Sequence, residues 1–134
     1  MDSANKWKSY VIDSFAWLEY FAGSSAGAEA KPFIESGKSI TPTIVLAELT
    51  EKYRRERMPF APDRDFIIGK TRVISLDADI AEKAGNINHE RKRVVKQWGL
   101  ADSIVLATAR QHGATIITGD EHFRDLAHEA HVIE

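Results

Sequence analysis

The sequence contains no cysteine, which excludes disulfides, cysteine-ligated zinc, iron–sulfur clusters and thiol nucleophiles. It also lacks any apolar run near the roughly 20 residues that a membrane helix needs. The polar stretch from Met1 to Ser9 holds no apolar signal-peptide region. Neither sign of charge dominates, because 18 basic and 20 acidic residues leave a formal charge of −2. This balance argues against a general nucleic-acid coat, and the expectation is a cytoplasmic protein without a membrane anchor.

The remaining composition is that of a soluble globular protein, with 43% hydrophobic and 28% charged residues. A chain of 134 residues is long enough to bury one hydrophobic core. No repeat, low-complexity tract or long linker interrupts it. We therefore expect a single domain over residues 1–134.

Short apolar runs alternate with segments of helical periodicity along the whole chain. Gly37 and Gly99 separate such segments, and Asp77 stands where a helix-capping residue is expected. This order predicts a mostly parallel sheet covered by helices on both faces, which is a three-layer α/β/α fold. The predicted strands are 9–13, 38–41, 73–76, 115–118 and 131–133, and the predicted helices are 14–21, 26–36, 43–56, 64–70, 78–93, 101–112 and 121–127.

Two aspartates stand just after predicted strands. Asp13 ends the first strand, and Asp120 follows the strand 115–118 after a single residue, Gly119, which allows a sharp turn. Functional groups of an open parallel sheet gather beyond the carboxyl ends of its strands, so both carboxylates are expected at one edge. Each aspartate could instead simply cap the helix that follows it.

Two further acids lie on predicted helices. Asp102 shares the apolar arc of Val105 and Leu106, where an ionised carboxylate is costly unless it is paired, hydrogen-bonded or bound to a cation. Its place in the first turn leaves helix capping as the alternative. Glu48 lies at the edge of an apolar arc, where an ordinary solvent-exposed glutamate is the alternative. Four carboxylates brought together would repel one another, and a divalent cation with oxygen ligands, Mg²⁺ or Mn²⁺, would relieve that repulsion.

Four segments of the chain resemble a known family: YVIDSFAWLEYF, TIVLAELTEKY, VISLDADIAEKAG and ADSIVLATARQHGATIITGDEHF. In this order and spacing they are similar to PIN-domain ribonucleases, specifically VapC-type toxins of toxin–antitoxin pairs. The resemblance covers about residues 10–133. It implies that the family's catalytic and metal-binding acids correspond to Asp13, Glu48, Asp102 and Asp120. It also implies that Ser14 and Thr118 border the site.

The resemblance further implies an activity and partners. The activity is hydrolysis of RNA phosphodiester bonds by metal-activated water, with Mg²⁺ or Mn²⁺ held first by Asp13 and Asp102. The partners are a small cognate antitoxin and a second copy of the chain in a homodimer. One position departs from the pattern, because many relatives carry another acid where this chain has His122. A histidine can ligate Mn²⁺ or contact phosphate, so a second metal position stays open.

Two other features have alternative interpretations. Basic residues cluster at 52–57 and 91–96, and each cluster is either a phosphate-docking rim or a solvated helix face. Aromatic and aliphatic residues surround the predicted helix 14–21, which is either fully buried or part of an antitoxin-binding groove. The residues concerned are Lys52, Arg54, Arg55, Arg57, Arg91, Lys92, Arg93 and Lys96 for the clusters, and Phe15, Trp17, Leu18, Tyr20 and Phe21 for the helix.

Competing functions make distinct demands on the sequence. A haloacid dehalogenase-type phosphatase needs a second aspartate two residues after the first, where Phe15 stands. A response-regulator receiver needs a lysine after its last strand, and none follows residues 131–133. A non-catalytic PIN domain would have lost some of the acids, and all of them are present. A housekeeping nuclease that processes ribosomal RNA remains the alternative to a toxin, although such proteins usually carry added domains.

Overall fold

The computed structural model describes residues 8–134. Five parallel strands form one sheet in the order β3-β2-β1-β4-β5. The strands are β1 (Tyr10–Ile12), β2 (Ser39–Pro42), β3 (Arg72–Ile74), β4 (Thr115–Thr118) and β5 (Ala130–Val132). The order in which successive strands join the sheet reverses between β1 and β4, which are parallel neighbours although about a hundred residues separate them.

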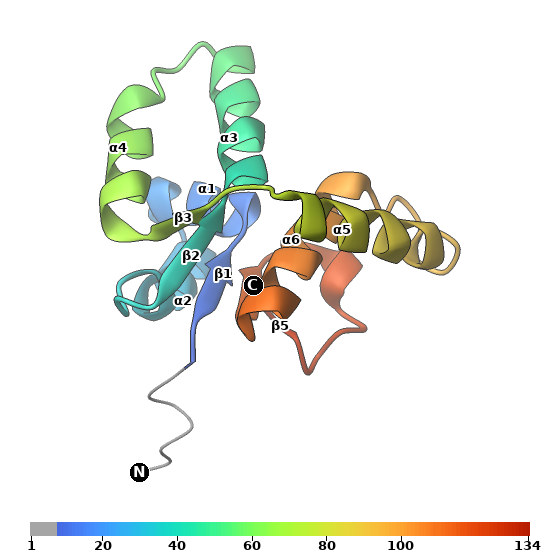
Figure 1. The fold of residues 1–134 in the computed structure, drawn as a ribbon. Helices are drawn as coiled ribbons and strands as arrows, with labels where there is room; N and C mark the ends of the chain where they lie inside the picture. The colour runs from blue at the N-terminus through green and yellow to red at the C-terminus, as the bar shows by residue number, and fades with distance from the viewer. Residues whose placement is uncertain (1–7) are drawn as a thin grey trace.

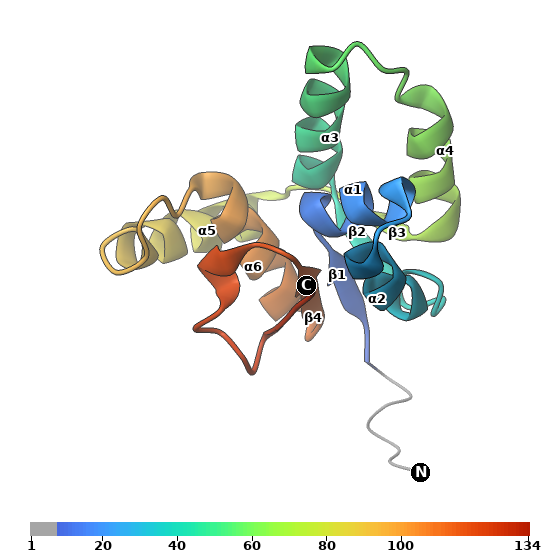
Figure 2. The same cartoon turned by 180° about the vertical axis from the view of Figure 1, so that it is seen from behind.

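Helices cover both faces of this sheet, as the sequence predicts. Helices α1 (Ser14–Ala22) and α2 (Ser25–Ile34) pack together on one face, and α5 (Ala78–Arg91) and α6 (Leu100–His112) pack together on the other (Figures 1 and 2). Helices α3 (Thr43–Arg55) and α4 (Ala61–Lys70) form an arm that rises beyond the sheet (Figure 1). The predicted three-layer α/β/α architecture is confirmed.

The hydrophobic core lies where the sheet meets α1 and α6. Val11, Ile12, Ile116 and Ile117 on the two central strands are completely buried. Helix α6 has seven consecutive buried residues, 103–109, which explains why its sequence is apolar almost all round. No helix within residues 8–134 is long and apolar enough to cross a membrane.

The structure corrects the predicted helix 121–127. Only Glu121–Phe123 forms a single 3-10 turn, η2. The carbonyl of His122, which would accept a hydrogen bond inside a longer helix, instead accepts one from the Arg91 guanidinium at 3.1 Å. The chain must also reach β5 at Ala130, which leaves too few residues for a full helix and a return.

Smaller differences concern the ends of elements. Helix α4 begins at Ala61, three residues earlier than predicted, because Pro62 is accommodated in its first turn. Helix α2 ends at Ile34 and α5 at Arg91, each two residues early, whereas α6 begins one residue early at Leu100. Strand β3 starts at Arg72 and β5 at Ala130, one residue before the predicted starts.

Candidate metal centre

The carboxyl ends of the two central strands carry the first two predicted acids. Asp13 follows β1, and Asp120 follows β4 after Gly119. Since β1 and β4 are paired in parallel, with Ile12 opposite Ile117, both aspartates leave the same edge of the sheet. The arrangement that strand direction predicts is therefore present.

The two helical acids reach the same place from different elements. Asp102 stands in the first turn of α6, and Glu48 stands near the middle of α3. A pocket of about 180 Å³ is lined by all four acids together with Ser14, Phe15, Leu18, Val105 and Phe123. The structure thus brings Asp13, Glu48, Asp102 and Asp120 to one cavity.

Helix capping and site formation turn out to be compatible. Oδ1 of Asp13 accepts from the Ala16 amide at 3.0 Å, and Oδ2 of Asp102 accepts from the Gly99 amide at 3.0 Å. Oδ1 of Asp120 accepts from the His122 amide at 2.9 Å. Each aspartate therefore uses one oxygen to fix its backbone. Among the described residues, Oδ1 of Asp102 and Oδ2 of Asp120 accept no hydrogen bond and remain open to a further ligand.

Two hydroxyl groups hold the acids in position. Thr118 is completely buried, and its hydroxyl hydrogen-bonds to the Asp13 carboxylate and accepts from the Asp120 amide at 2.9 Å. Ser14 Oγ donates to Glu48 Oε1 at 3.3 Å. Burial places Thr118 under the carboxylates, where it orients Asp13 and Asp120 and cannot touch a substrate, whereas Ser14 lines the cavity itself.

The electrostatics of the site favour a bound cation. Burial raises the pKa of Asp13 from 3.8 to about 7, and the carboxylates of Asp120 and Glu48 add to the rise. Desolvation also raises the pKa values of Glu48 and Asp102, and repulsion from Asp120 contributes to both. Carboxylates that resist ionisation in the absence of a counterion gain the most from a positive ion.

His122 lies inside the cluster. Its Nδ1 is 3.3 Å from Asp102 Oδ2 and 3.3 Å from Asp120 Oδ1. One ligand atom from each of these three residues lies within 4.8 Å of the others, so the group has the spacing of a metal site. A set of carboxylate oxygens with one imidazole nitrogen fits a divalent cation such as Mg²⁺ or Mn²⁺.

Gly119 has a different role from the one that the sequence predicts. Its φ is not among the positive values, so a sharp left-handed turn is not the reason for glycine. A Cβ atom at Gly119 would lie 2.0 Å from Cε1 of Phe15, whose ring packs over this position. Glycine is required because the Phe15 ring approaches the backbone that leads to Asp120.

We therefore expect Gly119→Ala to displace Phe15 and Asp120. Overpacking of this kind costs about 1–3 kcal/mol of unfolding free energy. Gly85→Ala is the matched control, because a Cβ atom on α5 at that position meets nothing within 4 Å. The control should gain about 0.5–1 kcal/mol. Urea denaturation of both variants checks the difference, and equal stabilities would contradict the close approach.

Sequence reasoning missed a buried arginine that fixes the segment carrying Asp120 and His122. Arg91 makes two hydrogen bonds to Asp125, at 3.0 and 2.9 Å, besides the one to the His122 carbonyl. Its guanidinium carbon lies 4.2 Å from the centre of the Trp98 ring, and only 12% of the side chain is exposed. The sequence grouped Arg91 with the basic cluster 91–96, but it faces inward and is not available to phosphate.

The other basic cluster lies beside the acids. Lys52 and Arg55 line a small pocket with Ser14, Leu18 and Glu48. Lys52 pairs with Glu56 at 3.2 Å and Arg55 with Glu51 at 3.0 Å, both as exposed pairs one helical turn apart. Such pairs are weak, so these two cations are exposed side chains beside the acidic cavity that other groups can engage.

Comparison with known proteins identifies the family of this chain. A family model described as the PIN domain matches residues 10–129. The chain belongs to the PIN domain family. The match spans all four acids, both central strands and the arm α3–α4. A search of curated protein sequences finds no match.

Solved structures similar to this PIN domain include several toxin–antitoxin complexes. A toxin–antitoxin complex from Klebsiella pneumoniae matches with 20% identity and a TM-score of 0.74, covering 92% of this chain and 97% of that one. VapBC2 from Rickettsia felis, bound to a promoter DNA fragment, matches with 15% identity and a TM-score of 0.72, covering 93% and 98%. VapC20 from Mycobacterium tuberculosis, a toxin that cleaves the sarcin–ricin loop, matches with 21% identity and a TM-score of 0.67, covering 88% and 95%. At these identities the likeness shows the shared fold.

Proposed function

We propose that this PIN domain is a ribonuclease that hydrolyses RNA phosphodiester bonds with Mg²⁺ or Mn²⁺. One observation carries the proposal: four carboxylates from four separate elements line one cavity at the sheet edge of a PIN domain. No cysteine lines this cavity, and its one hydroxyl, that of Ser14, donates a hydrogen bond to Glu48, so the proposal assigns water as the nucleophile.

The roles proposed for the four acids are those that the family resemblance implies: Asp13 and Asp102 hold the cation, and Glu48 and Asp120 complete the cluster or orient the attacking water. The spacing of Asp102, Asp120 and His122 supports a cation at this place. Glu48 is exposed at the rim and its pKa is raised, so it is suited to accept a proton from that water. When bound, a divalent cation lowers the pKa of coordinated water and neutralises charge that develops on the phosphate. Lys52 and Arg55, which line one pocket beside Glu48, bind a phosphate of the RNA next to the cleaved bond.

Cleavage of single-stranded and structured RNAs with Mg²⁺, Mn²⁺ or EDTA tests this proposal. Asp102→Asn should lower the rate at least about 100-fold, a loss typical when one charge-stabilising group is removed. The amide oxygen can still accept from the Gly99 N–H, so the fold is retained. Asp79→Asn is the control, because within residues 8–134 the one partner of the Asp79 side chain is Lys83, in an exposed pair. Cleavage that persists in EDTA or in Asp102→Asn would overturn the metal-dependent mechanism.

His122 sets the preference between the two cations in this proposal. An imidazole nitrogen suits Mn²⁺ better than Mg²⁺, which favours oxygen ligands. We therefore expect His122→Asp to lower the ratio of Mn²⁺ to Mg²⁺ affinity by about tenfold, a usual size for changes at metal sites. Calorimetric titration of each ion measures this ratio. An unchanged ratio would mean that His122 only hydrogen-bonds to Asp102 and Asp120.

The proposal extends to a toxin of a toxin–antitoxin pair, in which a small antitoxin and a second copy of the chain bind this domain. Its support is the fold shared with toxin–antitoxin complexes and a partly exposed aromatic surface on α1 and α4. Trp17 is completely buried, but Phe15 and Phe66 are 42% and 38% exposed. Tyr20 stacks on Phe66 at 5.8 Å between ring centres. The helix is thus neither fully buried nor freely exposed, and an apolar antitoxin segment would cover what remains.

Expression and light scattering test this extension. Pulsed expression should arrest growth and create new RNA ends, placing the activity in the cytoplasm where RNA is found. Co-expression of the small protein encoded beside this gene should restore growth, and the purified chain should scatter light as a dimer. Cleavage without growth arrest would favour the alternative, a housekeeping nuclease that processes RNA.

A further inference from the structure

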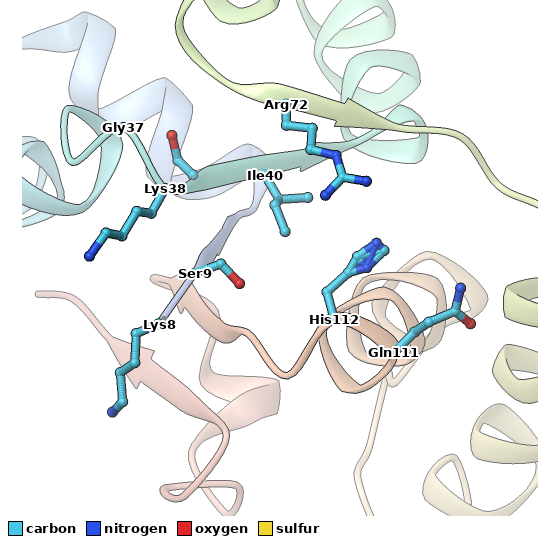
Figure 3. Close-up of a pocket in the computed structure, with 9 residues that line it drawn as sticks. Lys8, Ser9, Gly37, Lys38, Ile40, Arg72, Gln111 and His112 are labelled. Carbon is cyan, nitrogen blue, oxygen red and sulfur yellow. The ribbon is translucent and has the colours of Figure 1, made fainter. Parts of the chain in front are cut away.

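A second pocket lies at the opposite edge of the sheet from the four acids. It has a volume of about 540 Å³ and is lined by residues at the amino ends of β1, β2 and β3 and at the end of α6. None of its residues lines the acidic cavity. The lining residues are Lys8, Ser9, Gly37, Lys38, Ser39, Ile40, Arg72, Gln111 and His112 (Figure 3).

The charge of this pocket departs from that of the whole chain. Three of its lining residues are lysine or arginine and a fourth is histidine, and none is acidic. The chain as a whole has a net charge of −2, whereas the described residues that line this pocket carry more positive than negative charge. Such a concentration of cations attracts anions.

Two side chains face each other across the pocket. The guanidinium of Arg72, on β3, and the ring of His112, at the end of α6, extend toward one another, and Ser9 lies to one side of them (Figure 3). Within residues 8–134, no carboxylate pairs with Arg72. Nε2 of His112 is buried and has no hydrogen-bond partner in the same part of the chain. The pocket therefore holds an exposed cation that no described carboxylate neutralises, next to a ring nitrogen whose hydrogen-bonding capacity is unused.

Helix ends account for only part of this charge. His112 is the last residue of α6, where a cation stabilises the carboxyl-end dipole. Arg72 begins a strand and Lys8 precedes one, so the dipole of a helix does not explain them. The two positions contribute charge that packing and capping do not require.

We propose that this pocket binds the phosphate monoester of a nucleotide, with Arg72 and His112 as its main contacts. The guanidinium fork of arginine matches two phosphate oxygens, and the doubly charged group can use several donors at once. The volume of about 540 Å³ exceeds the needs of a bare phosphate and lies in the usual range for small-molecule pockets. The sugar and base would occupy the remaining space near Gln111 and Ile40. This proposal does not depend on the nuclease activity.

Nuclear magnetic resonance of the 15.0 kDa chain tests the proposal. Metal is removed on a chelating resin, so that no cation draws phosphate to the acids. Adenosine monophosphate should shift the amide signals of Ser39, Arg72 and Gly113 and leave that of Gly119 unchanged. Inorganic phosphate should shift the same signals with weaker affinity, and adenosine should not shift them. The proposal would be overturned if succinate bound as tightly as adenosine monophosphate. It would also be overturned if adenosine monophosphate at about 10 mM, a concentration that detects even very weak binding, shifted none of these signals.

Matched variants locate the contacts. Arg72→Gln and His112→Asn should each weaken nucleotide binding at least about tenfold, as expected when a charge-assisted hydrogen bond is lost. Arg93→Gln removes the same charge from an exposed position outside the pocket and should bind like the wild type. Equal weakening by Arg93→Gln and Arg72→Gln would show attraction by overall charge only and would contradict a specific pocket. If adenosine monophosphate binds more tightly than inorganic phosphate, the pocket recognises a nucleotide. If the two bind equally, the pocket recognises free phosphate, and the nucleotide assignment is overturned.

Discussion

Asp13→Asn is expected to stabilise the metal-free protein at pH 8 while abolishing RNA cleavage. The pKa of Asp13 is raised from 3.8 to about 7 because the carboxylate is buried beside other acids. Since one pKa unit corresponds to about 1.4 kcal/mol, ionising Asp13 in the folded protein costs on the order of 4 kcal/mol. Asparagine avoids this cost and can still accept from the Ala16 amide. We expect a rise in melting temperature of about 8–16 °C, since each kcal/mol is worth about 2–4 °C in a domain near this size.

The contribution of Asp13 to stability should fall as the pH rises. A raised pKa means that the folded state binds a proton more tightly than the unfolded state. The stability that Asp13 contributes is therefore fully present below about pH 4 and is lost as the pH rises through about 7. Melting curves between pH 4 and 8 should show this decline in wild type and a smaller one in Asp13→Asn. Added Mg²⁺ should raise the melting temperature of the wild type at pH 8 and leave that of Asp13→Asn unchanged. If the melting temperatures of the two proteins declined equally with pH, Asp13 would not have the raised pKa on which this prediction depends.

Arg91→Ala should produce the largest combined loss of stability and metal affinity outside the acids themselves. Removal of the guanidinium leaves the Asp125 carboxylate and the His122 carbonyl without their partner and exposes the Trp98 ring. Because the Asp125 carboxylate is half exposed, loss of the ion pair itself costs about 0–1 kcal/mol, and the His122 carbonyl left without its partner adds about 1–3 kcal/mol. The segment with Asp120 and His122 would lose its fixed position, and Mn²⁺ affinity should fall about 10- to 100-fold.

Arg124→Ala is the matched control for Arg91→Ala. Arg124 lies on the same segment and pairs with Glu121 and Glu134, but half of its side chain is exposed. An exposed pair contributes about 0–1 kcal/mol, so the control should keep both stability and Mn²⁺ affinity. Arg91→Lys keeps the positive charge but cannot make two parallel hydrogen bonds to Asp125, so it shows whether the charge or the guanidinium geometry is needed. Undiminished Mn²⁺ affinity in folded Arg91→Ala would show that Arg91 is not a positioning residue.

The positions of Asp13 and Asp120 could be predicted because they depend on local patterns. An apolar run of four residues indicates a strand, and parallel strands place whatever follows them at one edge. Asp102 was identifiable from its place on an apolar helix, although the structure shows that it also accepts from the Gly99 amide. Asp13, Asp102 and Asp120 therefore do accept hydrogen bonds as capping residues, and they also line one shared cavity.

Other features depend on contacts between distant parts of the chain, and no periodicity reveals them. Arg91 reaches Asp125 across 34 residues, so in the sequence it looks like one more basic residue at the end of a helix. The role of Gly119 depends on the Phe15 ring, which arrives from α1. The same Arg91 contact to His122 shortens the predicted helix 121–127 to one turn. Tertiary contacts overrode local preference at each of these positions.

Calorimetric titration of metal-stripped protein with Mn²⁺ at pH 8 tests the central claim, that the four acids form one cation site. Wild type and Asp79→Asn should each bind Mn²⁺ saturably. Asp13→Asn and Asp102→Asn should weaken binding at least about tenfold, as expected when a residue of a metal site is lost. Absence of saturable binding in wild type, or undiminished binding in both active-site variants, would contradict the account.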